Sequence, residues 1–342
     1  MAPTSFLEIP DWREEKHCVH KTIPEKLGFF ITDNQKLELA GSFDSLSIKE
    51  PTVRFQSWRN KFLAQFNADF STTRNILSIL MNTPFEVNEA KRKWTIFARL
   101  EGLNKIHLYL EDNCIKSEKL ERQYDQLKRY FLSRKPEYLH RKMITVDQQY
   151  FYEVCRIIVG SNKVIYSSEN VGVISDDKVT KLADLKEVEH VYCDVYESND
   201  IPAELMNYNP YSWSHAELIP AKTCLIGIYN NDNDCLDNIL NFTIDKFKDF
   251  RNFENLWSPF GAWNFLNLFL DFVKYEVFNI KINYRNQCIW KFESFANGND
   301  GITCEPLMME SVDGVERIIS DVPVMWFKSY IDLGNLNLEN ET

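Results

Sequence analysis

The sequence lacks the marks of membrane, secreted and zinc-binding proteins. No apolar run reaches bilayer length, because the most apolar stretch, 261–280, is interrupted by Asn264, Asp271 and Glu276. The first residues do not combine a basic segment with an apolar one, as a secretory signal would. The eight cysteines are scattered and form no C-x-x-C pair. We therefore expect an intracellular protein, in the nucleus or the cytoplasm, with reduced cysteines and no membrane partner.

The common catalytic and nucleotide-binding motifs are missing as well. The chain contains no G-x-x-x-x-G-K-[ST], G-x-G-x-x-G, G-x-S-x-G or H-E-x-x-H. Cys18 and His20 form the nearest Cys/His pair, but no second pair follows at zinc-finger spacing. These absences argue against a P-loop enzyme, a dinucleotide-binding domain, a serine hydrolase of the elbow type and a zinc protease.

The charge is acidic overall and basic in one segment. The 342 residues carry a formal net charge of −11, which argues against a general nucleic-acid binder. Between Lys116 and Lys142, however, nine Lys or Arg face four Asp or Glu. Within this segment Ser117–Ser133 has the apolar spacing of a helix. Its basic side is either a solvated helix face or a track for nucleic-acid phosphates with aromatic stacking.

Strand-like and helix-like segments alternate along the whole chain. The pattern predicts strands at 27–39 and 94–110 (two each), 171–175, 190–196, 225–229, 288–295 and 315–319, and helices from about 71 to 83, at 117–133 and 143–159, within 201–220, and at 258–277. This mixture favours one α/β (α+β) domain with a central mixed β-sheet flanked by helices. We place the domain at 27–333, after an irregular N-terminal arm at 1–26 and before a loose C-terminal tail at 334–342.

Two acidic residues stand in apolar surroundings. Asp194 lies in the middle of the expected strand His190–Tyr196, which is paired with Val171–Ser175, and Glu153 lies near the apolar side of the expected helix Met143–Val159. Neighbouring strands can hold carboxylates close enough to share metal ions. The alternative is that both acids are solvated or held by local hydrogen bonds.

Several stretches, in order along the chain, resemble the DXO/RAI family of decapping nucleases. Thr83–Leu110 resembles the family pattern TPYE…W…SR-F…LYL, and Asp147–Cys155 resembles G-Y-K-F-E. Val171–Asp176 falls at the position of G-E-[IV]-D, and 190–198 matches Y-V-E-L-K-T-S. Ser212–Asn231 resembles W-W-x-Q-S-F-L-P-G-V. The resemblance implies a DXO/RAI-like nuclease fold and metal-dependent cleavage at RNA 5′ ends. Two Mg²⁺ or Mn²⁺ ions would stabilise the attacking and leaving oxygens.

Three residues match functional positions implied by the resemblance. Arg99 stands at the position of an arginine that grips phosphate. Glu153 stands at the position of the helix glutamate, and Asp194 takes the place of the glutamate in the E-x-K strand. These two carboxylates would be the remaining metal ligands and, in an active protein, the catalytic acids.

Four other positions depart from the implied pattern. Val173 and Ser175 replace both carboxylates of the E-x-D strand, and Asp176 would restore one only through a register shift that turns its side chain to the other face. Tyr196 stands in place of the lysine, and His215 stands in place of a glutamine that contacts substrate. Two carboxylates can hold one ion but hardly two.

The sequence supports three hypotheses for function. The first is a catalytically impaired or inactive relative of the decapping nucleases that still binds RNA 5′ ends or nucleotides, with a weak metal site or none. The second is an active Mg²⁺- or Mn²⁺-dependent decapping, NAD-cap-removing or 5′→3′ exoribonuclease of RNA quality control. The third is a scaffold for RNA-decay proteins such as a 5′→3′ exoribonuclease, which the acidic charge suits better than RNA binding.

Overall fold

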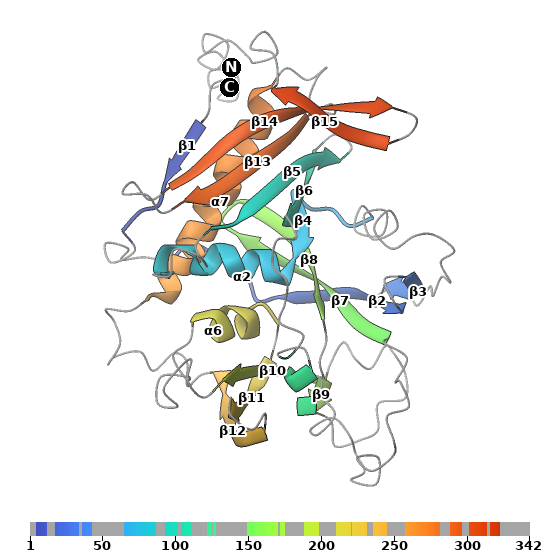
Figure 1. The fold of residues 1–342 in the computed structure, drawn as a ribbon, viewed down its shortest axis with the longest axis vertical. Coiled ribbons are helices and arrows are strands. Elements are labelled where there is room, and N and C mark those ends of the chain that lie inside the picture. The colour runs from blue at the N-terminus through green and yellow to red at the C-terminus, as the bar shows by residue number, and fades with distance from the viewer. Residues whose placement is uncertain are drawn as a thin grey trace, which may run out of the picture.

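The fold is described from a computed structural model. It describes residues 5–11, 18–33, 36–42, 65–86, 93–101, 104–110, 119, 122–124, 126–127, 149–169, 172–174, 188–197, 210–219, 221–230, 235–244, 257–280, 288–295, 301–312 and 315–321. The architecture is a large mixed sheet, a smaller second sheet and a few helices (Figure 1).

The large sheet contains eleven strands within the described residues, in the order β1-β14-β13-β5-β6-β4-β8-β7-β2-β3, with β15 beside β14. Its strands are β1 (Ser5–Glu8), β2 (Glu25–Asp33), β3 (Lys36–Ser42), β4 (Phe70–Thr73), β5 (Thr95–Glu101), β6 (Lys105–Leu110), β7 (Gln149–Val159), β8 (Asn162–Glu169), β13 (Cys288–Phe295), β14 (Gly301–Val312) and β15 (Val315–Asp321). Strand β4 runs parallel to β6 and β8, and the other pairings are antiparallel. The predicted central mixed sheet is therefore confirmed.

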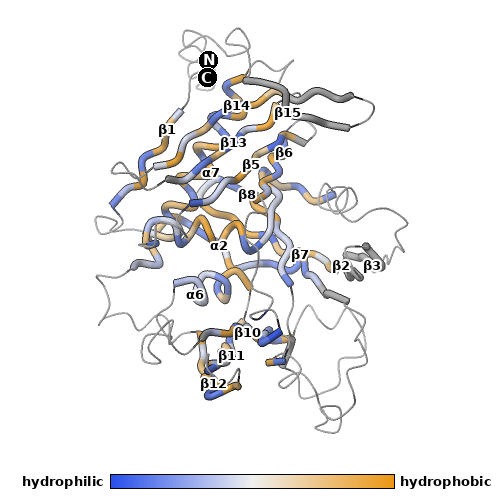
Figure 2. The backbone as a smooth tube through the Cα atoms, viewed as in Figure 1, coloured by the Kyte–Doolittle hydropathy of each residue, from blue (hydrophilic) through white to orange (hydrophobic). Residues whose placement is uncertain are grey.

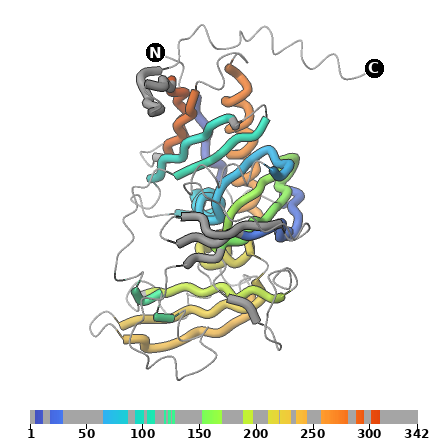
Figure 3. The backbone as a smooth tube through the Cα atoms, turned by 90° about the vertical axis from the view of Figure 1, so that its right-hand side faces the viewer, coloured from blue at the N-terminus to red at the C-terminus, as the bar shows by residue number. Residues whose placement is uncertain are grey.

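The smaller sheet has the order β12-β11-β10-β9. Its strands are β9 (Gly172–Ile174), β10 (Glu189–Glu197), β11 (Ala221–Asn230) and β12 (Cys235–Thr243). Strand β10 pairs antiparallel with β9, as the sequence predicted for this strand pair, and parallel with β11. Seen from the side, this sheet forms a separate layer below the large one (Figure 3).

Among the described residues, helices α2 (Arg74–Asn82), α6 (Pro210–Glu217) and α7 (Pro259–Asn279) pack against these sheets. A short 3₁₀ turn, η2 (Thr83–Phe85), follows α2. Helix α7 begins as predicted, because Ser258 accepts a hydrogen bond from the Gly261 amide and Pro259 occupies the first turn. It contacts α2 and the large sheet, whereas α6 lies between α2 and the smaller sheet (Figure 1).

The apolar core lies between α7, α2 and one face of the large sheet. Hydrophobic residues concentrate along these elements (Figure 2). Its largest fully buried side chains include Trp213, Trp263 and Trp290, together with Phe269 and Phe292. Both faces of β10 and β11 carry buried apolar residues. Tyr192 and Ile226 join the main core, while Val191 and Leu225 form a small cluster on the other face.

Helix α2 starts slightly later than the sequence suggested. The sequence predicted a start near residue 71, but Ser71 and Thr72 lie in β4, and Thr73 caps the helix by accepting the Ile76 amide. The two strand–turn–strand predictions, at 27–39 and 94–110, are confirmed by β2–β3 and β5–β6. Helix α6 and the buried strand β11 were also correctly anticipated.

The prediction of a helix at 143–159 is wrong for the residues that the structure describes. Gln149–Val159 form β7, which is paired with β2 on one side and β8 on the other. Consecutive residues Val154 and Cys155 are both fully buried, which interrupts the alternation expected for a strand with one exposed face. Phe151, Val154 and Ile158 also fall at helical spacing in the sequence, so the pattern resembles part of a buried helix.

The N-terminal arm is not irregular throughout. Ser5–Glu8 pair with β14, and Lys21 forms a bridge with Val159. In the predicted helix 117–133 the described residues, 119, 122–124 and 126–127, are helical. None of the helices that the structure describes is long and apolar enough to span a membrane.

Candidate functional site

Strand β10 presents four polar residues on one face. His190, Tyr192, Asp194 and Tyr196 alternate with residues that point the other way, as expected for a strand. The alternating partners Val191 and Cys193 pack with Leu225 on the outer side of the smaller sheet. The four polar side chains therefore face α6 and the large sheet. Together with Glu153 they are called the inter-sheet site below.

Asp194 is held by two tyrosines. Its Oδ2 accepts hydrogen bonds from the Tyr192 hydroxyl at 2.6 Å and from the Tyr196 hydroxyl at 3.1 Å. Its Oδ1 accepts the Val195 amide at 2.9 Å. Burial raises the pKa of Asp194, and these hydrogen bonds act in the opposite direction. The same carboxylate, after burial, raises the pKa of Tyr192. A mid-strand carboxylate is thus fully engaged by donors from its own strand.

Helix α6 completes this end of the site. The Ser212 hydroxyl lies 2.5 Å from the Tyr196 hydroxyl, and the His215 ring stacks on Tyr192 with centroids 6.2 Å apart. The helix is itself fixed to α2 by a buried network, in which Ser214 Oγ lies 2.6 Å from Ser78 Oγ and 2.8 Å from Asn82 Nδ2. His215, predicted as a substrate contact, is therefore placed at the site through Tyr192.

Glu153 makes a contact across the two sheets. Its Oε2 lies 3.1 Å from Nε2 of His190, and both residues are 1% exposed. Glu153 comes from β7 of the large sheet, whereas His190 comes from β10. The two predicted carboxylates, Glu153 and Asp194, therefore face the same space but have different partners.

Two further polar contacts join the sheets near this pair. Lys26, which pairs with Cys155 on the neighbouring strand β2, donates from Nζ to the Val188 carbonyl at 3.0 Å. The Tyr166 hydroxyl on β8 donates to the Leu218 carbonyl at 2.6 Å. Lys26 is 8% exposed and Tyr166 is fully buried. These contacts hold the start of β10 and the end of α6 against the large sheet.

Arg74 is a functional candidate that sequence reasoning missed. It is the first residue of α2, where a helix terminus favours anions. Its positive charge acts to lower the pKa of Tyr192 and Asp194, so the guanidinium lies near the inter-sheet site. Atom Nη1 is buried and has no hydrogen-bond partner among the described residues. The clue in the sequence was a basic residue directly after a polar N-cap.

Glu169 is a second missed candidate. It ends β8 and pairs with Tyr152, next to the pairing of Ser168 with Glu153. Burial raises the pKa of Tyr124, nearby Glu169 and Asp194 raise it further, and Arg74 lowers it. Glu169 and Asp194 therefore both lie near Tyr124, although Glu169 alternates along β8 with Ser168, the partner of Glu153. Glu169 lies four residues before Val173, the position that the motif comparison assigned to a carboxylate.

Arg99 is not brought to this face. It lies on β5 between Ala98 and Leu100, which belong to the main core, so its side chain points to the opposite side of the large sheet. Its pairing partner His107 is bonded there to Ser71, with Nδ1 and Oγ 2.9 Å apart. Val173 pairs with His190 in the backbone ladder. Ser175 and Asp176 lie outside the described residues.

The donors present do not fit a pair of divalent ions. Mg²⁺ and Mn²⁺ need carboxylate oxygens directed at the ion. Here the Asp194 oxygens accept three hydrogen bonds, and Glu153 Oε2 faces the His190 nitrogen. In the part of the chain that the structure describes, no three His, Cys, Asp or Glu side chains are grouped to hold a metal. No catalytic step through metal ions can therefore be built from these contacts.

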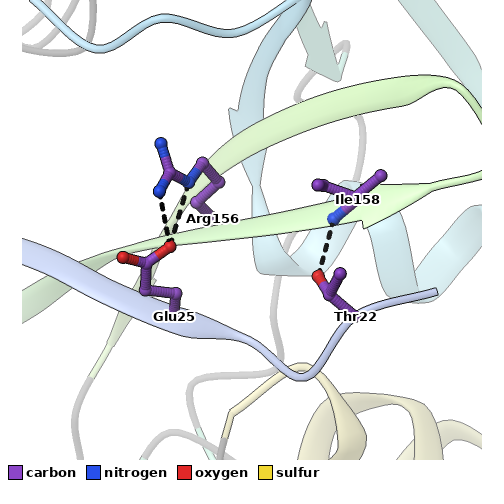
Figure 4. Close-up of polar contacts among 4 residues, drawn as sticks. All are labelled: Thr22, Glu25, Arg156 and Ile158. Carbon is purple, nitrogen blue, oxygen red and sulfur yellow. Dashed lines mark hydrogen bonds and ion pairs between the residues drawn. The ribbon is translucent and has the colours of Figure 1, made fainter.

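A separate pocket of about 310 Å³ lies on the other face of β7. Arg156 and Ile158 line it, and Arg156 donates from Nε and Nη2 to one oxygen of Glu25 at 3.1 and 2.6 Å (Figure 4). The Ile158 amide donates to Thr22 Oγ1 at 3.0 Å (Figure 4). Because Arg156 alternates with Cys155, this pocket is separated from the inter-sheet site by the sheet.

The comparisons with known proteins agree on the fold. No family model and no curated protein matches the sequence. Among solved structures, one similar protein is a Schizosaccharomyces pombe Rai1 variant with three glutamates substituted, in complex with 3′-FADP. It is 13% identical to this chain, with a TM-score of 0.63, and the match covers 90% of this chain and 100% of the Rai1 chain. Candida albicans Rai1 in complex with pU5 and Mn²⁺ is 11% identical with a TM-score of 0.57, covering 91% and 94%.

Kluyveromyces lactis Dxo1 in complex with manganese is also similar, at 10% identity and a TM-score of 0.56 over 89% of this chain and 98% of that one. Identities this low carry information about the fold and not about individual residues. The likeness extends over nearly the whole chain, as the ordered sequence stretches predicted. The chain has the fold of the Rai1 and Dxo1 decapping nucleases.

Proposed function

We propose that this protein binds RNA 5′ ends or related nucleotides at the inter-sheet site and cleaves them poorly or not at all. The observation that carries the proposal is that both predicted metal-ligand carboxylates are engaged within the protein, Glu153 by His190 and Asp194 by Tyr192 and Tyr196. Without two ions to stabilise attacking and leaving oxygens, phosphodiester cleavage loses its main electrostatic support.

Nucleotide binding is supported independently of catalysis. The S. pombe Rai1 variant with three substituted glutamates is in complex with 3′-FADP, so that protein binds 3′-FADP without those three glutamates. In this chain Arg74, at the start of α2, supplies a buried guanidinium nitrogen and a helix N-terminus. Both features favour an anion such as a 5′-phosphate. We therefore assign phosphate binding to Arg74 in place of Arg99.

Turnover is the first experiment. RNAs with a labelled 5′ end carrying a monophosphate, triphosphate, unmethylated cap or NAD cap are incubated with Mg²⁺ or Mn²⁺ and the wild type or Glu153→Gln. We expect no product from either protein, beside an active Rai1 as positive control. Product from the wild type that is lost in Glu153→Gln would overturn the proposal and indicate an active nuclease, with Glu169 as the acid to examine next.

Binding is measured on the same RNAs by fluorescence anisotropy without metal. We expect a preference for 5′-phosphate over 5′-hydroxyl RNA, and a loss of roughly 10–100-fold in affinity in Arg74→Met, because a charged hydrogen bond is removed. Arg156→Gln, on the other face of β7, is the matched control and should bind normally. Binding lost only in Arg122→Gln would instead assign RNA to the basic segment 116–142, and no binding at all would favour the scaffold hypothesis.

A further inference from the structure

Residues 18–22 of the N-terminal arm, called the 18–22 segment below, are hydrogen-bonded to β7 and to α7. The Thr22 amide donates to the Ile158 carbonyl of β7 at 3.1 Å, and the Thr22 hydroxyl accepts the Ile158 amide at 3.0 Å (Figure 4). Near the other end of the segment, the Val19 amide donates to Asn264 Oδ1 of α7 at 2.7 Å. The backbone in the middle of the segment is therefore held from both sides.

Lys21, in the middle of this segment, reaches the end of α6. Its Nζ forms an ion pair with Oε1 of Glu217, the last residue of that helix, and lies 4.4 Å from the centroid of the Trp263 ring on α7. The side chains of Lys21 and Glu217 are 28% and 17% exposed, so solvent screens this pair less than a surface ion pair. A cation at this place also complements the partial negative charge at the C-terminus of the helix.

Helix α6 contributes two side chains to one end of the inter-sheet site. The Ser212 hydroxyl lies 2.5 Å from the Tyr196 hydroxyl, and the His215 ring stacks on Tyr192. Glu217 follows His215 by two residues in the same helix. Because a helix of this length moves as one body, a contact that fixes Glu217 also restricts where the other two side chains lie.

We propose that Lys21 is a positioning residue of the inter-sheet site. Its contact with Glu217 fixes the end of α6, so the 18–22 segment keeps Ser212 and His215 in place. This inference deepens the proposed function and rests on it for its effect on RNA. A lysine that contacted phosphate directly would respond differently to a change at Glu217. Removal of a neighbouring acid would then strengthen RNA binding, whereas removal of the partner of a positioning lysine should weaken it.

The first test is hydrogen exchange of the full chain, followed by mass spectrometry without RNA. Lys21→Met keeps a side chain of similar length but removes its charge, so the α6 peptide should exchange roughly 3–10-fold faster than in the wild type. Lys21→Arg keeps a cation for Glu217 and Trp263 and should restore slow exchange. The β13 peptide should exchange equally in all variants, which shows that they are folded. Unchanged exchange of α6 in Lys21→Met would overturn the proposal.

The second test measures the affinity for 5′-phosphate RNA by fluorescence anisotropy. Lys21→Met and Glu217→Gln should each weaken binding by roughly 3–10-fold, and the double variant should lose no more than either single one, because both act through one contact. Stronger binding in Glu217→Gln would identify Lys21 as a direct phosphate contact and would overturn the proposal. The matched control is Lys222→Gln, since this lysine also lies near a glutamate, Glu189, at 3.9 Å, but its side chain is 78% exposed. Its affinity should equal that of the wild type.

The two measurements separate a failure of this inference from a failure of the proposed function. If the wild type binds no RNA while Lys21→Met still accelerates exchange in α6, the proposed function is wrong and Lys21 still positions the helix. If the wild type binds RNA and neither Lys21→Met nor Glu217→Gln weakens binding, the proposed function stands and the positioning role is wrong.

Discussion

The core around α7 and the inter-sheet site solve the problem of burial in different ways. Around α7, aromatic rings fill the space: Phe269 packs edge-on against Trp94 and Phe292, with ring centroids 5.8 and 5.5 Å apart. Between the sheets, polar groups are buried: Asp194 accepts a hydrogen bond from the Tyr192 hydroxyl, and Glu153 Oε2 lies 3.1 Å from Nε2 of His190. Apolar packing stabilises a fold directly, whereas buried polar groups contribute mainly when every partner is present.

The largest effect should come from the apolar side. Phe269→Ala removes a fully buried ring from the middle of α7 and leaves a cavity beside Trp94 and Phe292. We expect a loss of about 3–5 kcal/mol in the free energy of unfolding, measured by urea denaturation. Phe260→Ala, in the first turn of the same helix and 49% exposed, is the control and should cost far less. Similar losses in the two variants would mean that the core does not rest on α7.

Much of the α7 side could be predicted from sequence because its signals are local. The Ser258-Pro259 start of α7 and the alternation in β5 and β6 each lie within a few consecutive residues. Strand β7 was mistaken for a helix because the consecutive residues Val154 and Cys155 are both buried, which interrupts the alternation that identifies a strand. The only local indications of a strand were the length of the apolar segment and the turn at Gly160 that follows it.

The partners of the inter-sheet site could not be predicted in the same way. Glu153 and His190 come from strands of different sheets, so their contact depends on how the two layers pack. Asp194 could be recognised as an unusual mid-strand acid, but the hydroxyl of Tyr196 becomes its partner only through the spacing of the strand. Arg74 resembles a surface residue of a helix start until β10 is placed against it.

The next largest effect concerns the turn between β7 and β8. Gly160 has φ +59°, and an added Cβ would collide with the side chain of Asn267 on α7. Its amide also donates to the His20 carbonyl at 2.8 Å. Gly160→Ala should therefore cost about 1–3 kcal/mol, read from the urea midpoint. The double variant Gly160→Ala/Asn267→Ala removes the collision and should regain part of the loss; no recovery would assign the whole cost to the backbone conformation.

A smaller effect is expected where the inter-sheet site is anchored. Ser214→Ala removes the hydroxyl that joins α6 to Ser78 and Asn82 of α2, leaving buried donors without an acceptor. We expect a loss of about 1–2 kcal/mol in stability. RNA affinity should fall as well, because α6 also carries Ser212 and His215. If stability falls and affinity does not, the position of α6 is irrelevant to binding. Ser78→Ala/Ser214→Ala should cost less than the sum of the single changes.

The smallest effect tests a buried acid of α7, Glu276. Glu276 is 4% exposed, and burial raises its pKa while a hydrogen bond with Ser5 of β1 lowers it. Three hydrogen bonds act to lower the pKa of Asp194, whereas only the bond with Ser5 acts to lower the pKa of Glu276. Its folded pKa is above the unfolded value, so the folded state binds the proton more tightly. The resulting stability is present below the unfolded pKa and is lost as pH rises through the folded pKa.

Glu276→Gln removes this titration and keeps a polar side chain for Ser5. We expect it to be more stable than the wild type at neutral pH by roughly 1–3 °C in Tm, with the difference shrinking as pH falls through the folded pKa. Thermal unfolding of both proteins from pH 4 to pH 8 measures this. If the Tm difference between the two proteins does not depend on pH, burial does not raise the pKa of Glu276. The α7 side would then tolerate a buried acid as well as the inter-sheet site does.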